Sequence, residues 1–91
     1  MFFFLGHDIN FSGKYSAVDV AQYLIRKCTL DGEPISNLQL QKILYYIQAY
    51  FLQQEYRAFF SDDIEAWTFG PVVRNVYMLF FIFVQLRFLF Y

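Results

Sequence analysis

The sequence predicts a small, mostly α-helical domain with a short extended or turn segment around residues 57–69. Two stretches carry apolar residues at helical spacing behind serine caps, and this spacing is lost across residues 56–69 and returns after Gly70-Pro71. A length of 91 residues suggests one domain. Hydrophobic residues make up 58% of the chain and aromatic residues 24%. Since so small a core cannot cover this much apolar material, we expect apolar surface that faces a partner.

The first helix is predicted over about residues 16–28. Ser16 is a suitable N-cap, and Asp19 follows at the capping-box position. Apolar residues then recur at steps of three and four: Ala17, Val20, Ala21, Leu24, Ile25 and Cys28. This spacing places one apolar stripe on the helix, which should pack on the core. Cys28 lies on that stripe and is expected to be a buried structural thiol, since no histidine is placed to activate it.

The second helix is expected after the turn signals Asp31-Gly32 and Pro34, with Ser36 and Gln39 as its capping box. One apolar stripe comprises Leu40, Ile43, Leu44, Ile47 and Phe51, and a second comprises Leu38, Tyr45, Ala49 and Leu52. A helix that is apolar on two sides is usually central in a fold, so we interpret it as scaffold. The remaining polar surface is assigned to Gln41, Gln48, Gln53 and Gln54, and Gln41→Ala is therefore expected to cost little stability.

Residues 56–69 lack a helical period, and residues 61–63 indicate a turn between two short extended pieces. Gly70 and Pro71 form a structural break, with Pro71 expected in the first turn of a third helix. Helical spacing then continues through Val72, Val73, Val76, Tyr77 and Phe80.

Three regions follow from this pattern. Residues 1–14 are interpreted as a loose N-terminal extension, residues 15–77 as the helical domain, and residues 78–91 as an atypical apolar tail. The tail has Gln85 and Arg87 as its only polar residues, and it is shorter than the roughly 20 apolar residues that span a membrane. We expect no membrane span, and possible self-association through this tail.

Enzymatic activity is not expected, and we assign no catalytic, cofactor-binding or metal-binding residue. His7 is the single histidine, and it lies in the extension. The nearest group of carboxylates is Asp62, Asp63 and Glu65, which we interpret as a solvated loop because the ligand pattern of a calcium loop is absent. A single cysteine makes a reducing, cytoplasmic setting the default.

Nucleic acid is not an expected partner either. A net charge of −1 gives little attraction to phosphates. Seven residues (29–35) separate the first two predicted helices, whereas a helix-turn-helix uses a turn of about 3–4. Five aromatic residues instead suggest a protein-binding surface: Phe59, Phe60, Trp67, Phe69 and Tyr77. The alternative is that these rings cover the end of the second helix.

Three stretches in series resemble the Panacea domain, a family also called phage-associated GepA-like or SocA-like. They are KYSAVDVAQYLIRKC, ISNLQLQKILYYIQAYFL and IEAWTFGPVVRNVY, and the similarity runs from about Lys14 to Tyr77. The resemblance implies a mostly helical, cytoplasmic antitoxin, often found in phages and prophages, that neutralises a cognate toxin by direct binding. One branch of the family implies a second function, in which an adaptor delivers the toxin to an AAA+ protease. A DNA-binding regulator is the alternative outside protein binding.

The sequence departs from the family pattern at two places. Arg74 stands where the family usually has a second proline. The family domain also continues beyond Tyr77 with more polar helices, whereas residues 78–91 are almost entirely apolar. We therefore expect a C-terminally truncated or frameshifted copy.

Overall fold

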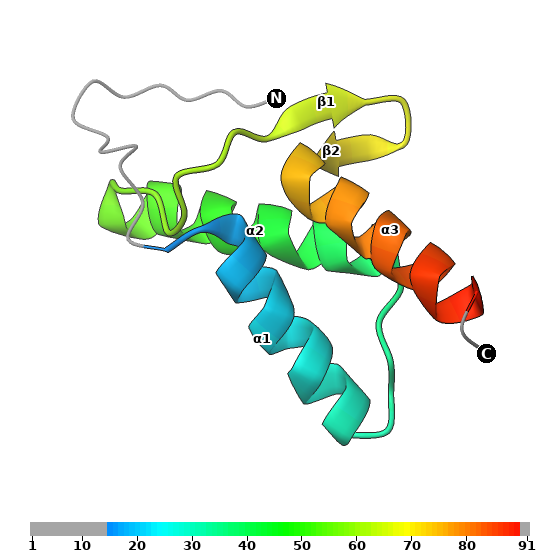
Figure 1. Cartoon of the computed structure of the whole chain (residues 1–91). Coiled ribbons are helices and arrows are strands. Elements are labelled where there is room, and N and C mark those ends of the chain that lie inside the picture. The colour runs from blue at the N-terminus through cyan, green and yellow to red at the C-terminus, as the bar shows by residue number, and fades with distance from the viewer. Residues whose placement is uncertain (1–14, 90–91) are drawn as a thin grey trace.

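The computed structural model describes the backbone of residues 15–89 and the side chains of residues 15–84, so the predicted extension lies outside the described part. The elements are α1 (Ala17–Leu30), α2 (Asn37–Glu55), β1 (Glu65–Trp67), β2 (Gly70–Val72) and α3 (Arg74–Leu89). Helices α1 and α3 lie against the same side of α2 and diverge from each other, while β1 and β2 form a hairpin above them (Figure 1). The predicted fold class, mostly α with a small extended segment, is confirmed.

Both predicted helix starts are confirmed by their caps. The Ser16 hydroxyl accepts the Asp19 N–H at 3.2 Å. At α2 the capping box is reciprocal, because Ser36 Oγ accepts the Gln39 N–H and Gln39 Oε1 accepts the Ser36 N–H at 2.9 Å. The first helix continues to Leu30, two residues beyond its predicted end. These starts follow from interactions within three residues, which is why the sequence reveals them.

The core lies where α1, α3 and the returning chain meet α2. Its buried members are Ala17, Ala21, Leu40, Leu44, Phe60, Val73 and Val76. Leu40 and Leu44 are fully buried, as the main apolar stripe of α2 predicts, and Ile43 and Ile47 are half-buried. Because α2 contacts α1, β2 and α3, its predicted role as the central scaffold is confirmed. Cys28 is half-buried on α1.

The predicted polar surface of α2 is wrong for two of its four glutamines. Gln53 and Gln54 are exposed, but Gln41 and Gln48 are only 3% and 5% exposed. These two lie seven residues apart, which is about two turns, so they project from the same side of the helix. That side is covered by the chain segment that follows α2.

Hydrogen bonds to the backbone explain why these glutamines are buried. Gln48 Nε2 donates to the Phe60 carbonyl at 2.8 Å, and Gln48 Oε1 accepts the N–H groups of Phe59 and Phe60 at 2.9 and 3.2 Å. Gln41 Oε1 accepts the Val73 N–H at 2.8 Å, and its Nε2 donates to Asn37 Oδ1 at 3.2 Å. A buried polar group is tolerated when it is paired, and no buried side-chain nitrogen or oxygen among the described residues lacks a partner. The two glutamines thus fasten both ends of the 59–73 segment to α2.

The hairpin lies later in the chain than expected. Its strands pair antiparallel, with Ala66 opposite Pro71 and Trp67 opposite Gly70, so the turn is at residues 68–69 rather than 61–63. Pro71 is in β2 and not in the first turn of a helix, and α3 begins only at Arg74. A two-stranded sheet has a free edge on each strand, which tolerates a residue without an N–H. Gly70 has φ of +128°, a conformation that favours glycine.

Helix α3 continues from the predicted domain into the predicted apolar tail without a break. The first seven residues of that tail are all large and apolar. Phe80 is half-buried, and the other six are exposed: Met78, Leu79, Phe81, Ile82, Phe83 and Val84. Within the described residues, no helix is both long enough and apolar enough to cross a membrane.

Candidate protein-binding surface

The structure divides the five predicted partner-binding aromatics into two groups. Phe60 is completely buried, and Phe59 is half-buried between Tyr15 and Phe51, with ring centroids 4.9 and 4.5 Å away. Phe60 therefore cannot contact a partner in this conformation, and its assignment to the binding surface is corrected. Phe59 therefore packs near the end of α2, as the alternative interpretation expects, whereas Phe60 belongs to the buried core.

The other three rings form a cluster at the hairpin, which we call the hairpin cluster: Trp67, Phe69 and Tyr77. Trp67 lies 5.1 Å from Tyr77 and 5.9 Å from Phe69 between ring centroids, both in edge-to-face geometry. Phe69 and Tyr77 are 5.9 Å apart. These separations lie in the range that favours aromatic pairs, so the rings support one another. Phe69 is 50% exposed, and the other two are half-buried.

Hydrogen bonds hold the hairpin cluster in place. The Trp67 indole N–H donates to Glu65 Oε1 at 2.9 Å, two residues earlier on the same strand. Asn37, at the start of α2, donates its side-chain N–H to the Tyr77 carbonyl at 3.1 Å. The bond from Val73 to Gln41 anchors the chain between β2 and α3. The cluster thus stands on a segment that is fixed to α2 at several points.

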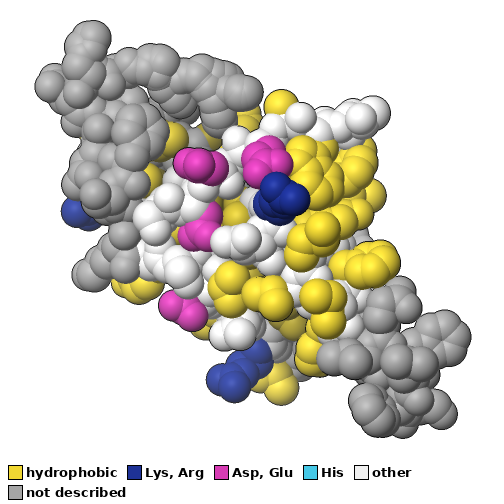
Figure 2. Space-filling model, turned by 45° about the horizontal axis from the view of Figure 1, so that its top comes forward, with side chains coloured by type: hydrophobic (Ala, Val, Ile, Leu, Met, Phe, Trp, Pro, Cys, Tyr) yellow, Lys and Arg dark blue, Asp and Glu magenta, His cyan; other side chains and the backbone are white. Residues whose placement is uncertain are grey.

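Hydrophobic side chains form a broad area on one side of the face in Figure 2, and acidic side chains lie on the other side. Exposed apolar residues near the cluster in sequence include Met78 and Leu79 on α3, and Leu38 follows Asn37 on α2. An exposed apolar area beside a rigid aromatic group is typical of a protein-binding surface.

Comparison with known proteins agrees with the resemblance seen in the sequence. The family model described as antitoxin SocA-like, Panacea domain, matches residues 40–85. The chain is also 44% identical over 61 residues to antitoxin SocA of Caulobacter vibrioides (strain NA1000 / CB15N). This chain belongs to the Panacea-domain family of SocA-like antitoxins. The aligned region covers 67% of the chain and 32% of that relative, so it spans about a third of the relative's length. No solved structure matches the chain.

The matched region of this Panacea domain includes most of the central helix, the hairpin and most of α3, and it continues past Tyr77 to Gln85. It therefore contains the hairpin cluster and both buried glutamines. Neither glutamine stands out in a single sequence, because glutamine is usually a surface residue. The signal available in the sequence was their seven-residue spacing, which places both on one side of the helix.

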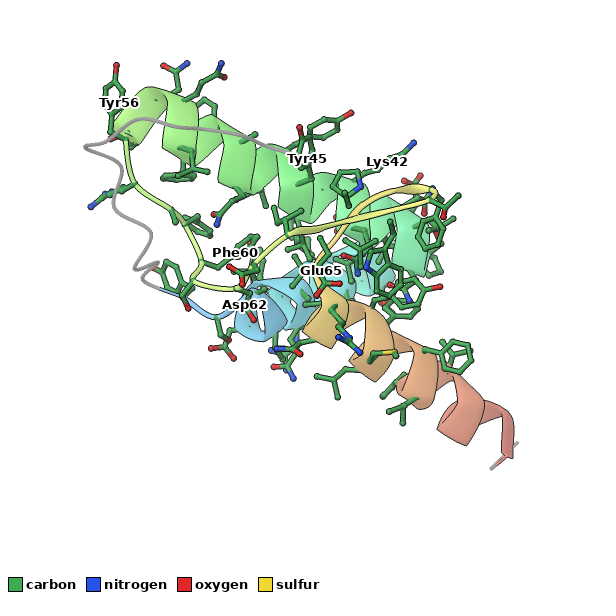
Figure 3. The ribbon with its side chains drawn as sticks, turned by 90° about the horizontal axis from the view of Figure 1, so that it is seen from above. Lys42, Tyr45, Tyr56, Phe60, Asp62 and Glu65 are labelled. Atoms are coloured by element: carbon green, nitrogen blue, oxygen red, sulfur yellow. The ribbon has the colours of Figure 1, made fainter. Side chains whose placement is uncertain are left out.

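Asp62 of this Panacea domain has a structural role. Asp62 Oδ1 accepts the Ala17 N–H at 2.8 Å, and its Oδ2 accepts the Asn75 side-chain N–H at 3.5 Å. Figure 3 shows Asp62 beside the start of α1, with Phe60 and Glu65 on neighbouring parts of the same segment. No group of three or more His, Cys, Asp or Glu residues that could hold a metal ion occurs among the described residues. The solvated-loop interpretation therefore changes for Asp62, which ties the first turns of α1 and α3 together.

Proposed function

We propose that this chain neutralises a toxin by binding it directly, and that the hairpin cluster is part of the surface that contacts the toxin. The observation that carries the proposal is the exposed aromatic cluster on a hairpin anchored to the central helix, in a chain of an antitoxin family. Neutralisation by contact needs a surface rather than a catalytic group, since covering a toxin's own site is sufficient.

The geometry of the cluster suits an interface anchor. Tryptophan and tyrosine often contribute most of the binding free energy at protein interfaces, because they bury a large area with few rotatable bonds. The indole N–H of Trp67 is already paired with Glu65, so a partner can cover the ring without leaving this donor unsatisfied. The edge-to-face contacts with Phe69 and Tyr77 also fix the ring before binding, which reduces the entropic cost of association.

Glu65 gives the surface a preference for a positively charged group on the partner. Its carboxylate lies beside the aromatic rings and is exposed on β1. A guanidinium or ammonium group of a partner could stack on an aromatic face and pair with this carboxylate at once. We therefore expect a cationic side chain among the toxin residues that meet the cluster.

The proposal can be tested by expressing this chain together with the product of the reading frame adjacent to the chain's gene. The chain should relieve growth arrest, and Trp67→Ala and Phe69→Ala should reduce that relief. Tyr50→Ala is the matched control, since Tyr50 is a 58% exposed aromatic on α2, about 20 Å along the helix from Asn37. Its removal should leave the relief unchanged.

Purified proteins distinguish direct neutralisation from delivery to a protease. Toxin and chain, mixed without any protease, should form a complex in which the toxin is inactive. If the toxin stays active until an AAA+ protease is added, the adaptor mechanism replaces the one proposed here. Full neutralisation by a folded Trp67→Ala, Phe69→Ala double variant would place the binding surface elsewhere.

A further inference from the structure

A second apolar surface lies between α1 and α3, and Trp67, Phe69 and Tyr77 do not line it. Both helices are tied together at their first turns through Asp62, and they diverge from there (Figure 1). The space between them is a groove of about 820 Å³. Its apolar lining includes Ile25, Ile35, Leu79, Phe80, Phe83 and Val84. A volume of this order accommodates several large side chains of a bound segment.

The α3 wall of the groove is open to solvent in the described part of the chain. Leu79 is 51% exposed, and Phe83 and Val84 are exposed as well. Not every apolar residue of α3 contributes to this wall, because Phe81 and Ile82 point elsewhere and do not line the groove. The groove is therefore a distinct site rather than a general property of an apolar helix.

The α1 wall adds two charges of opposite sign. Asp19 and Arg26 both line the groove and are seven residues apart, about 10 Å along one side of α1. The ion pair recorded among the described residues joins Lys27 and Asp31, so neither Asp19 nor Arg26 has an ion-pair partner there. An occupant that matches this surface carries a cation near Asp19, an anion near Arg26, and apolar residues toward α3.

We propose that the groove seats an amphipathic helix supplied by the part of longer family members that lies outside the region matched here. The Caulobacter relative is about three times as long as the aligned region, so its sequence offers ample length for such a helix. The α3 wall falls within the residues that match the family model. A helix laid into a groove presents residues at positions i, i+3, i+4 and i+7, which suits both the apolar wall and the seven-residue spacing of the charges. This inference rests on family membership and is independent of toxin binding.

The charge pattern disfavours a second copy of α3 as the occupant. The charged residues within α3 are Arg74 and Arg87, and the helix contains no carboxylate that could pair with Arg26. A second copy would bring apolar residues to the groove but would leave Arg26 without a partner.

Binding can be measured with the purified part of the Caulobacter antitoxin that lies outside the matching 61 residues, with no toxin present. We expect a one-to-one complex with the full chain by sedimentation and by fluorescence anisotropy. Leu79→Glu should weaken the complex at least tenfold. Ile82→Glu is the matched control, since Ile82 is equally exposed at 51% on the same helix but does not line the groove. The affinity of this variant for the probe should stay within threefold of the wild-type value.

A charge exchange tests the α1 wall. Asp19→Lys should weaken the complex several-fold, and the wild-type affinity should fall as salt is raised. Circular dichroism of each variant establishes that the helices are retained. The proposal is overturned if no complex forms at about 100 µM with a folded probe, or if Leu79→Glu and Ile82→Glu weaken it equally. Self-association that Leu79→Glu abolishes, without any binding of the probe, would instead assign the groove to a second copy. Because the assay contains no toxin, none of these outcomes bears on neutralisation.

Discussion

Helices α2 and α3 both carry apolar residues on more than one side, although α3 is the more apolar of the two, and they are used in opposite ways. Each is apolar around most of its circumference. The central helix buries two glutamines and leaves Tyr46 and Tyr50 exposed, whereas α3 leaves Ile82 and Phe83 exposed. Polarity alone therefore does not determine which side of a helix faces inward in this domain.

The polar groups of the side chains explain this difference between the two helices. Tyrosine can cover apolar surface with its ring while its hydroxyl stays in water, so the outer side of α2 is acceptable without a partner. The exposed side chains of Leu79, Ile82 and Phe83 on α3 have no polar end. The buried glutamines fasten a hairpin that presents aromatic rings to solvent. The contacts of α2 with α1, β2 and α3 make it the scaffold, and our proposals place binding on the hairpin and α3.

The largest expected effect concerns the apolar side of α2. Leu44→Ala should lower the free energy of unfolding by about 2–5 kcal/mol, because Leu44 is fully buried and its removal leaves a cavity. Urea denaturation followed by circular dichroism measures this loss. Leu38→Ala is the control on the same helix, as Leu38 is 50% exposed, and it should cost much less. Equal losses would mean that α2 is not oriented as described.

The buried glutamines provide a sharper test of the same helix. Gln48→Ala removes the partner of two N–H groups and one carbonyl at Phe59 and Phe60, and should cost about 1–3 kcal/mol or slightly more. Gln41→Ala should also cost about 1–3 kcal/mol, because it leaves the Val73 N–H unpaired. The expectation from the sequence that Gln41→Ala costs little is thereby reversed. Gln53→Ala, at an exposed position, should stay within about 0.5 kcal/mol, and a similar value for Gln48→Ala would contradict the structure.

The turn that carries the hairpin cluster should depend on Gly70. Gly70→Ala should cost about 1–3 kcal/mol through backbone strain, since φ is +128° there. Steric overlap does not contribute, as no atom lies within 4 Å of an added Cβ. The readouts are the denaturation midpoint and toxin affinity, with Thr68→Ala in the same turn as the control. An unchanged midpoint and affinity for Gly70→Ala would show that the hairpin adopts another conformation.

The smallest expected change in stability is on α3. Ile82→Gln should alter the free energy of unfolding by no more than about 0.5 kcal/mol, because Ile82 is half exposed to solvent. It should nevertheless reduce self-association, since it removes apolar surface. Sedimentation velocity over a range of concentrations measures this. A loss above 1 kcal/mol would indicate that α3 is packed as tightly as α2, and the contrast between the two helices would fail.

Features that depend on near neighbours in sequence were predictable, and those that depend on distant backbone were not. The caps at Ser16 and Ser36 involve residues three positions away, and the apolar stripe containing Leu40 and Leu44 follows from helical spacing alone. The partners of Gln48 lie 11 and 12 residues away, and Val73, which donates its N–H to Gln41, lies 32 residues away. The seven-residue spacing of the glutamines indicates a shared side of α2, but no local pattern identifies their distant partners.

The candidate site was predicted in part for the same reason. Proximity in sequence grouped five aromatic residues, but the buried glutamine Gln48 draws Phe59 and Phe60 onto α2, while the hairpin turn carries Trp67 and Phe69 outward. Pro71 was assigned to a helix because its local preference fits a helix start as well as a free strand edge. Tertiary contacts decided between the two.

Side-chain oxidation by hydroxyl radicals, with and without the toxin bound, tests the central claim most directly. It reports solvent access to each aromatic residue of the intact chain. We expect protection of Trp67, Phe69 and Tyr77 in the complex, with Tyr46 and Tyr50 on α2 oxidised as in the free chain. Protection of Tyr46 and Tyr50, with Trp67 and Phe69 unchanged, would contradict the assignment of α2 as scaffold and of the hairpin cluster as the toxin-binding surface.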